Sequence, residues 1–216
     1  MHPSLPPAER TVGQLVAESI KLYGRHFLRA LPLGVVVAGV NQLTIDASRL
    51  GVEAVLLAAA PVFSAAYAYA CQLEAEGTPR RSWLIAIAAG SLVFVPAALL
   101  FPWFALASVL WLGLVGLAVP AAMREGTSFR ASLRRGFALG RVDYVHAAGA
   151  LATLVILFFL MRIGLALLLE SQADNTVRTA IFLSDAVLAP VLFLGGSILY
   201  DDQRARLERR AEATPL

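Results

Sequence analysis

The sequence predicts an all-α, polytopic membrane protein with six transmembrane helices and two amphipathic helices on the cytoplasmic side. Hydrophobic residues make up 58% of the 216 residues, above the roughly 45–50% that is usual in soluble domains. The mean hydropathy is +0.71. A soluble core of this size could not enclose so much apolar surface, so the excess must face lipid. Basic residues also lie between the apolar stretches almost entirely on alternate sides, which is typical of a multi-pass protein.

Six apolar stretches are candidates for crossing a bilayer, whose hydrocarbon core takes about 20 helical residues. They comprise about residues 30–45, 52–72, 83–101, 104–122, 146–168 and 178–200. The third and fourth belong to one uncharged run, Ser82 to Met123, which would be about 63 Å long as a single helix. We therefore expect a hairpin that turns at Phe101-Pro102-Trp103, because proline stops a helix and tryptophan prefers the interface. The first stretch is short, and its helix can also begin as early as Phe27, with Arg29 reaching toward the interface.

The basic residues predict the orientation of these spans. Fifteen of the 18 lie in four segments: the tail before span 1, the 2–3 loop, the 4–5 loop and the tail after span 6. The intervening loops contribute only Arg49 and Arg178. By the positive-inside rule, both termini are cytoplasmic. Every basic residue except Lys21 is arginine, which suggests a GC-rich bacterial genome and hence the bacterial cytoplasmic (inner) membrane.

We interpret residues 11–204 as a single helical membrane domain. Residues 1–10 are rich in proline, lack the features of a signal peptide, and are expected to form a disordered tail. Residues 205–216 are expected to form a cytoplasmic tail. The polar stretch from Asp201 to Arg210 is interpreted as a solvated continuation of the last helix.

Two segments on the cytoplasmic side are amphipathic, at about 11–29 and 127–141. The first opens with a capping box, Thr11-x-x-Gln14. Its apolar stripe comprises Val12, Val16, Ile20, Tyr23 and Phe27. Helices of this kind lie in the interface and attract anionic headgroups, worth on the order of 1 kcal/mol per basic residue. The predicted headgroup contacts are Lys21, Arg25, Arg130, Arg134 and Arg135. Bracing of the bundle from below is an alternative role, compatible with lipid contact.

Two ionisable residues lie well inside predicted spans, Arg162 in the fifth and Asp185 in the sixth. Each is about eight residues, or roughly 12 Å, from the outer end of its helix. Consecutive spans joined by a short loop are usually antiparallel neighbours, and a lone charge at a helix centre costs on the order of 2.5–3.5 kcal/mol. We therefore predict an Arg162–Asp185 salt bridge that fixes the register of the two helices. The alternatives are a pair lining an aqueous cavity that binds an anionic solute or headgroup, and an arginine that extends outward unpaired.

Catalytic and cofactor-binding motifs are missing from the sequence. His2, His26 and His146 do not stand at metal-ligand spacing with one another or with a carboxylate or cysteine. Cys71 is the single cysteine, so the chain cannot form an internal disulfide. Serines inside the spans have no basic partner that would activate them. We expect no enzyme activity, no metal, no cofactor and no nucleic-acid partner.

Several short motifs, in order along nearly the whole chain, resemble a known family. They are Thr11-Val-Gly-Gln-Leu, Ile20-Lys-Leu-Tyr-Gly-Arg-His-Phe27, Val119-Pro-Ala-Ala-Met-Arg-Glu-Gly126, Ser132-Leu-Arg-Arg-Gly-Phe-Ala-Leu139, and Ala189-Pro190 to Tyr200-Asp-Asp-Gln-Arg204. Together they look like the membrane domain of bacterial glycerophosphoryl diester phosphodiesterases and its stand-alone relatives. In that family the hydrolase is a separate soluble domain after the membrane part. The 216 residues do not include it, so the resemblance does not imply hydrolase activity, and it implies no established chemistry for the membrane domain.

Two hypotheses about function follow. The first is a non-enzymatic scaffold or accessory protein of the inner membrane, which contacts anionic lipid through its cytoplasmic arginines and has an unidentified protein partner, if any. The second is a small transporter or permease component with Arg162 and Asp185 in its pathway. A dry, close contact between these two residues favours the first hypothesis. A water-filled cavity that reaches the pair from the outer face favours the second.

Overall fold

The structure is a computed structural model that describes residues 6–74 and 80–213, and within these ranges every regular element is a helix. The chain begins with a single 3-10 turn, η1 (Pro7–Glu9). The α-helices that follow are α1 (Val12–Arg25), α2 (Phe27–Thr44), α3 (Arg49–Glu74), α4 (Arg80–Leu100), α5 (Ala105–Val115), α6 (Ala118–Glu125), α7 (Phe129–Val142), α8 (Tyr144–Leu168), α9 (Asp174–Leu188) and α10 (Pro190–Glu212). The all-α prediction is therefore confirmed.

Among the residues described, six helical stretches are long and apolar enough to span a membrane, which confirms the predicted number. They are Phe27–Thr44, Arg49–Glu74, Ser82–Leu100, Ala105–Glu125, Tyr144–Leu168 and Asp174–Glu212. The first begins at Phe27, the earlier of the two predicted starts. The fourth consists of α5 followed by α6, and the sixth of α9 followed by α10. Pro190 opens α10, where its missing N–H costs no helical hydrogen bond.

The uncharged run folds into a hairpin with its turn where the sequence predicted it. Helix α4 ends at Leu100 and α5 begins at Ala105. The indole N–H of Trp103 donates a hydrogen bond to the Glu53 carboxylate at 2.8 Å. The Arg49 guanidinium lies 4.3 Å from the centre of the Trp103 ring. The turn is thus held to the start of α3 by polar contacts typical of an interfacial tryptophan.

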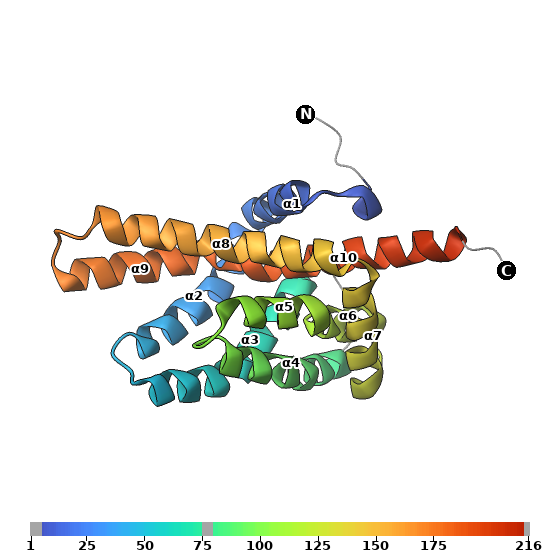
Figure 1. Cartoon of the computed structure of the whole chain (residues 1–216), viewed down its shortest axis with the longest axis horizontal. Coiled ribbons are helices and arrows are strands. Elements are labelled where there is room, and N and C mark those ends of the chain that lie inside the picture. The colour runs from blue at the N-terminus through green and yellow to red at the C-terminus, as the bar shows by residue number, and fades with distance from the viewer. Residues whose placement is uncertain (1–5, 75–79, 214–216) are drawn as a thin grey trace.

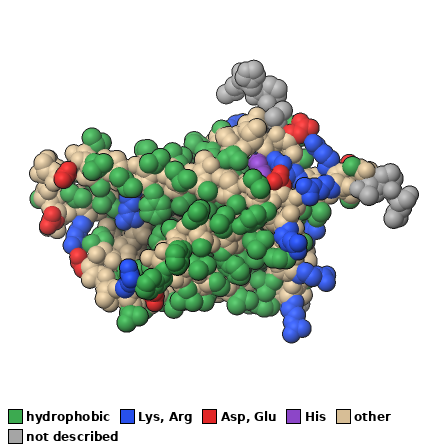
Figure 2. Space-filling view, in the orientation of Figure 1, with side chains coloured by type: hydrophobic (Ala, Val, Ile, Leu, Met, Phe, Trp, Pro, Cys, Tyr) green, Lys and Arg blue, Asp and Glu red, His purple; other side chains and the backbone are tan. Residues whose placement is uncertain are grey.

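The two ends of the described chain meet at one end of the bundle (Figure 1). The Arg209 guanidinium on α10 lies 3.1 Å from the Glu9 carboxylate in η1. Basic side chains gather at this end, and apolar side chains cover much of the visible face of the bundle beside it (Figure 2). We call this end, with η1, α7 and the last turns of α10, the arginine-rich end. The opposite end, with the α2–α3 and α8–α9 connections, we call the far end. This shared position of the two ends agrees with an even number of candidate spans, such as the six found here.

The core centres on α10. Eleven of its residues between Pro190 and Gln203 are buried, and it packs against α1, α3, α7 and α8. One cluster of buried apolar side chains joins α10 to α3, and a second joins it to α1, α7 and α8. The continuous stretch Asp174–Glu212 is 39 residues, or about 58 Å as a helix, so it extends well beyond a hydrocarbon core of about 30 Å.

Glycines allow two of the closest helix contacts. A methyl group at Gly34 of α2 would overlap the backbone of Ala186 in α9. A methyl group at Gly136 of α7 would likewise overlap the backbone of Ala118 in α6. Such small residues let helix backbones approach closely. The first contact holds α2 beside α9, and the second holds α7 across the end of the bundle (Figure 1).

The first amphipathic helix is shorter than the predicted 11–29. The Thr11–Gln14 capping box is present, but α1 ends at Arg25 because His26 leaves the helical conformation, at φ −117° and ψ 25°. Phe27 therefore belongs to α2. The buried residues of α1 are Leu15, Ser19 and Tyr23, whereas Ile20 of the predicted stripe is 50% exposed. The second amphipathic helix, α7, coincides closely with the predicted 127–141.

Both expected tails are ordered in the parts that the structure describes. Residues 7–9 form η1, and Arg10 is bound to α10. Residues 205–210 continue α10 as a helix, as the sequence predicted, and the helix ends at Glu212. Residues 1–5 and 214–216 of the predicted tails lie outside the described residues.

Candidate functional site

Arg162 and Asp185 lie together near the far end, on α8 and α9. The two charged groups are 3.6 Å apart, measured from Arg162 Nη1 to Asp185 Oδ2. The Asp185 side chain is 1% exposed and that of Arg162 is 23% exposed. This distance is longer than the 2.7–2.9 Å of a charge-assisted hydrogen bond. The two charges are neighbours, but the Asp185 carboxylate accepts no hydrogen bond from the Arg162 guanidinium.

A third residue, Asn41 of α2, makes the closest contact with the buried carboxylate. Its side-chain amide donates to Asp185 Oδ2 at 2.8 Å. Asp185 Oδ1 is buried and has no hydrogen-bond partner among the described residues. The close approach of Gly34 and Ala186 brings α2 against α9 and so places Asn41 here. Sequence reasoning missed Asn41 because it compared only consecutive spans, although a polar amide near a span's end was a usable signal.

A cavity of about 380 Å³ opens between the helices on the inner side of this cluster. Arg162 and Asn41 line it, together with Thr44 at the end of α2. Most of the remaining wall is aromatic and aliphatic, from α3, α4, α5, α8 and α10. Its size falls within the range of ligand sites, about 300–1,000 Å³. Arg162, but not Asp185, therefore faces a sizeable, mainly apolar space.

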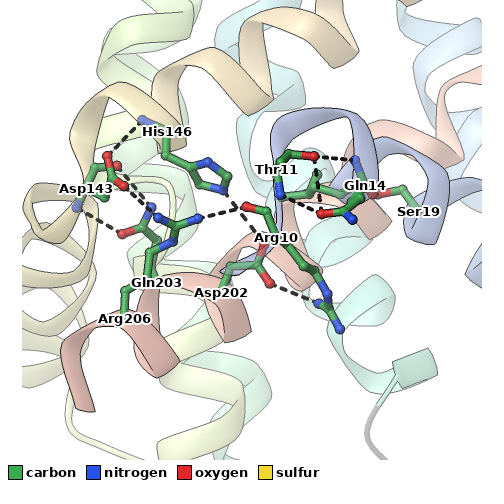
Figure 3. Close-up of polar contacts among 10 residues, drawn as sticks. Arg10, Thr11, Gln14, Ser19, Asp143, His146, Asp202, Gln203 and Arg206 are labelled. Carbon is green, nitrogen blue, oxygen red and sulfur yellow. Dashed lines mark hydrogen bonds and ion pairs between the residues drawn. The ribbon is translucent and has the colours of Figure 1, made fainter. Parts of the chain in front are cut away.

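The arginine-rich end contains a polar network, and its members on α10 belong to the stretch that the sequence interpretation placed in solvent (Figure 3). Asp202 is fully buried, and Arg10 donates to its Oδ1 at 2.9 Å. His146 Nε2 of α8 lies 3.8 Å from Asp202 Oδ2. The expectation of a solvated helix from Asp201 onward is wrong at Asp202 and also at Gln203, which is 0% exposed. Both residues face the interior because η1 and α8 cover this turn of α10.

The same network links α10 to the start of α8. Arg206 Nη1 donates to Asp143 Oδ2 at 2.7 Å, and its Nη2 donates to the Arg10 carbonyl at 2.8 Å. The Gln203 side chain accepts a hydrogen bond from the Asp143 N–H at 3.1 Å and donates to the Asp143 carbonyl at 3.0 Å (Figure 3). Asp143 also caps α8 by accepting from the His146 N–H at 3.1 Å. Nearly all of these hydrogen bonds join residues of the network to one another. We therefore interpret the network as a structural link between η1, α8 and α10.

A second polar cluster joins α3, α6 and α10 at this end. Arg124 Nη2 lies 2.6 Å from Glu74 Oε2, and its Nη1 lies 3.5 Å from Asp201 Oδ1. The Ser197 hydroxyl donates to the same Glu74 oxygen at 2.5 Å. Arg124 and Glu74 each have an opposite partner and a second contact, which is what a partly buried charge requires to be tolerated.

The predicted headgroup contacts occupy different surroundings. Arg130 and Arg134 are exposed on α7 and have no ion-pair partner in the described part of the chain. Lys21 is exposed and 3.4 Å from Glu18. Arg135 instead pairs with Glu125 at 2.8 Å, and Glu125 also accepts from the Tyr200 hydroxyl. Arg135 is therefore largely engaged within the protein.

Arg25, the fifth predicted headgroup contact, lines a smaller, polar cavity of about 240 Å³ under α1. Arg10, Glu18, His26 and Glu74 also line it. Both acidic and basic groups face this space, so its charge is balanced.

Tyr23 is buried on the same helix, and its hydroxyl is one of the buried polar atoms without a partner within the described ranges. Burial raises the pKa of this hydroxyl. It therefore stays neutral at physiological pH, which is the form that is less costly to bury.

Metal-binding clusters of three or more histidine, cysteine or carboxylate residues do not occur in the described ranges. No family model, curated protein or solved structure matches this chain, so the resemblance to the phosphodiesterase membrane domain stays a prediction carried by its motifs.

Proposed function

We propose that this protein is a non-enzymatic accessory or scaffold protein of the bacterial inner membrane, with its arginine-rich end in the cytoplasm, where it binds anionic lipid headgroups. The observation that carries the proposal is the outer face of α7. Arg130, Arg134 and Arg141 lie within about 40° of one another around this helix, and all three are exposed.

The packing of α7 supports this role. Its buried face, which includes Ser132, Gly136 and Gly140, lies against the bundle. The arginine stripe is consequently on the side turned away from the protein, on a helix that crosses the end of the spans (Figure 1). Phe137, 40% exposed, lies beside the stripe, and the Arg141 guanidinium is 5.4 Å from the centre of its ring. Basic and aromatic residues on one face of an interfacial helix are typical of contact with anionic membranes.

Lipid retention tests the proposal. The full chain is reconstituted in bilayers with equal phosphatidylglycerol and phosphatidylcholine, and the lipids that stay bound after extraction are identified by native mass spectrometry. We expect enrichment of phosphatidylglycerol, reduced several-fold by Arg130→Gln with Arg134→Gln, since each basic residue contributes on the order of 1 kcal/mol.

The matched control is Arg204→Gln with Arg209→Gln. These arginines are similarly exposed at the same end but are paired with Glu208 and Glu9, so their replacement should leave the enrichment unchanged. An equal loss in both double variants would contradict a specific role for α7. Reporter fusions at the two termini test the orientation, which requires both reporters to be cytoplasmic.

A second candidate function, a small transporter or permease component, is favoured by the cavity that reaches Arg162. Its test is solvent access at Asn41, using Asn41→Cys in a Cys71→Ala background and membrane-impermeant thiol reagents added to either side. A transport pathway predicts labelling from the far-end side and, in another state, from the arginine-rich side. Protection from both sides, with Ile45→Cys at the far end still labelled, would reject it.

A further inference from the structure

The cavity beside Arg162 is elongated along the bundle. Its lining residues on α8 extend from Leu151 to Arg162, and those on α3 extend from Leu56 to Tyr67. Each stretch covers eleven helical steps, or about 16 Å, roughly half of a hydrocarbon core of about 30 Å. A space of about 380 Å³ that extends over this length suits one extended chain.

The wall chemistry differs between the two ends of this space. The outer end, at the far end of the bundle, carries Arg162, Asn41 and Thr44. Further in, phenylalanine, leucine, valine and alanine dominate, and the hydroxyl groups are those of Tyr67 and Ser108. Ser108 already donates to the Ala97 carbonyl at 2.9 Å. A polar solute inside would lose its hydration without gaining enough partners. An apolar chain has no hydrogen bonds to water that it would lose in this space.

Arg162 supplies an anion-binding group at the mouth of the apolar part. A guanidinium carries five N–H donors, and Arg162 makes no hydrogen bond within the part of the chain that the structure describes. Its contact with Asp185 is 3.6 Å, and Asp185 Oδ2 is already bound by Asn41 at 2.8 Å. A carboxylate or phosphate can accept two parallel hydrogen bonds from such a group.

We propose that this cavity binds one anionic single-chain amphiphile, with its hydrocarbon chain along α3 and α8 and its carboxylate or phosphate at Arg162. The site is separate from the arginines of α7. It provides a ligand class for the second candidate function, and binding would stand even if no transport occurs.

Binding of oleate to the purified full chain tests the proposal, with oleyl alcohol as a probe that has the same chain and no charge. Both are titrated in non-ionic detergent and bound ligand is counted by native mass spectrometry. We expect one oleate per chain, bound more tightly than the alcohol. Arg162→Gln should weaken oleate binding about tenfold, the size expected for losing a charged hydrogen bond, and leave the alcohol unchanged. Arg162→Lys should retain most of the oleate affinity.

A second pair of variants tests the apolar part. Ala98 lines the cavity and the next residue, Leu99, is 46% exposed on the outside of α4. Ala98→Phe should reduce binding of both probes, whereas Leu99→Phe should reduce neither. Arg178→Gln, at an exposed far-end arginine that does not line the cavity, is the charge control. Each variant is first required to unfold at the temperature of the unaltered protein in the same detergent.

The outcomes separate the alternatives. If all variants bind the two probes equally, the probes are only partitioning into the detergent, and the proposed site is overturned. Equal affinity for oleate and alcohol overturns the role of Arg162. Replacing oleate with lysophosphatidic acid distinguishes a phosphate from a carboxylate ligand, and tighter binding of either anion that depends on Arg162 supports the proposal. Failure here leaves the test of α7 unaffected, because the two experiments change different residues and use different lipids.

Discussion

At the arginine-rich end, Arg10 holds the buried Asp202 carboxylate at 2.9 Å, and Arg124 lies 2.6 Å from Glu74. At the far end, Arg162 stays 3.6 Å from an equally buried Asp185, beside a cavity of about 380 Å³. Similar residue types therefore serve two purposes. Where two or three groups enclose each charge, the pairs join chain segments. Where the arginine keeps free donors next to empty space, the same chemistry is available to a ligand.

The largest expected effect is the loss of the Asp202 carboxylate. Asp202→Ala leaves Arg10 and His146 without their shared partner in a buried site, so we expect the free energy of unfolding to fall by about 3–5 kcal/mol. Denaturant titration in mixed micelles measures this. Glu208→Ala, which removes the exposed partner of Arg204 on the same helix, should cost at most about 1 kcal/mol. Equal losses would mean that burial of Asp202 contributes nothing.

A smaller effect is expected from the far-end pair. Arg162→Asp and Asp185→Arg should each destabilise the protein, because each places two like charges together in low dielectric. The double variant should restore about 1 kcal/mol relative to the sum of the two single losses, a modest coupling that fits the long distance. Thermal unfolding of all four proteins in one detergent gives the coupling. If the double reversal recovers nothing, the pair has no energetic role.

The smallest effect is expected at an exposed pair of the far end. Arg178 donates to Asp46 through both terminal guanidinium nitrogens, at 3.0 and 3.1 Å, but the Asp46 side chain is 74% exposed. Asp46→Asn should cost about 0.2–1 kcal/mol, and less in high salt. Glu9→Gln, which removes the exposed pair with Arg209 at the other end, should behave alike. A large difference between the two losses of stability would show that the position of the ion pair in the bundle, rather than its exposure, determines its energy.

The sequence was sufficient to predict the six spans because apolar length and charge alternation are local properties of the chain. It also predicted the turn at Phe101-Pro102-Trp103, where proline and tryptophan interrupt an uncharged run. Asp202 could not be recognised as buried, since its surroundings come from η1 and α8, and its ion-pair partner Arg10 is 192 positions away.

The far-end site was only partly predictable for a similar reason. Equal depth in consecutive spans pointed to Arg162 and Asp185. Asn41 reaches the same place through the α2–α9 contact, which depends on Gly34 having no side chain. The cavity is a space between helices and leaves no pattern in any one of them.

The central position of α10 has a consequence for how the protein is made. Helices α1, α3, α7 and α8 all pack against a helix that the ribosome synthesises after them. Until α10 has been made, these four helices lack their common partner. We therefore expect the contacts of the core to be completed only when the last helix is present.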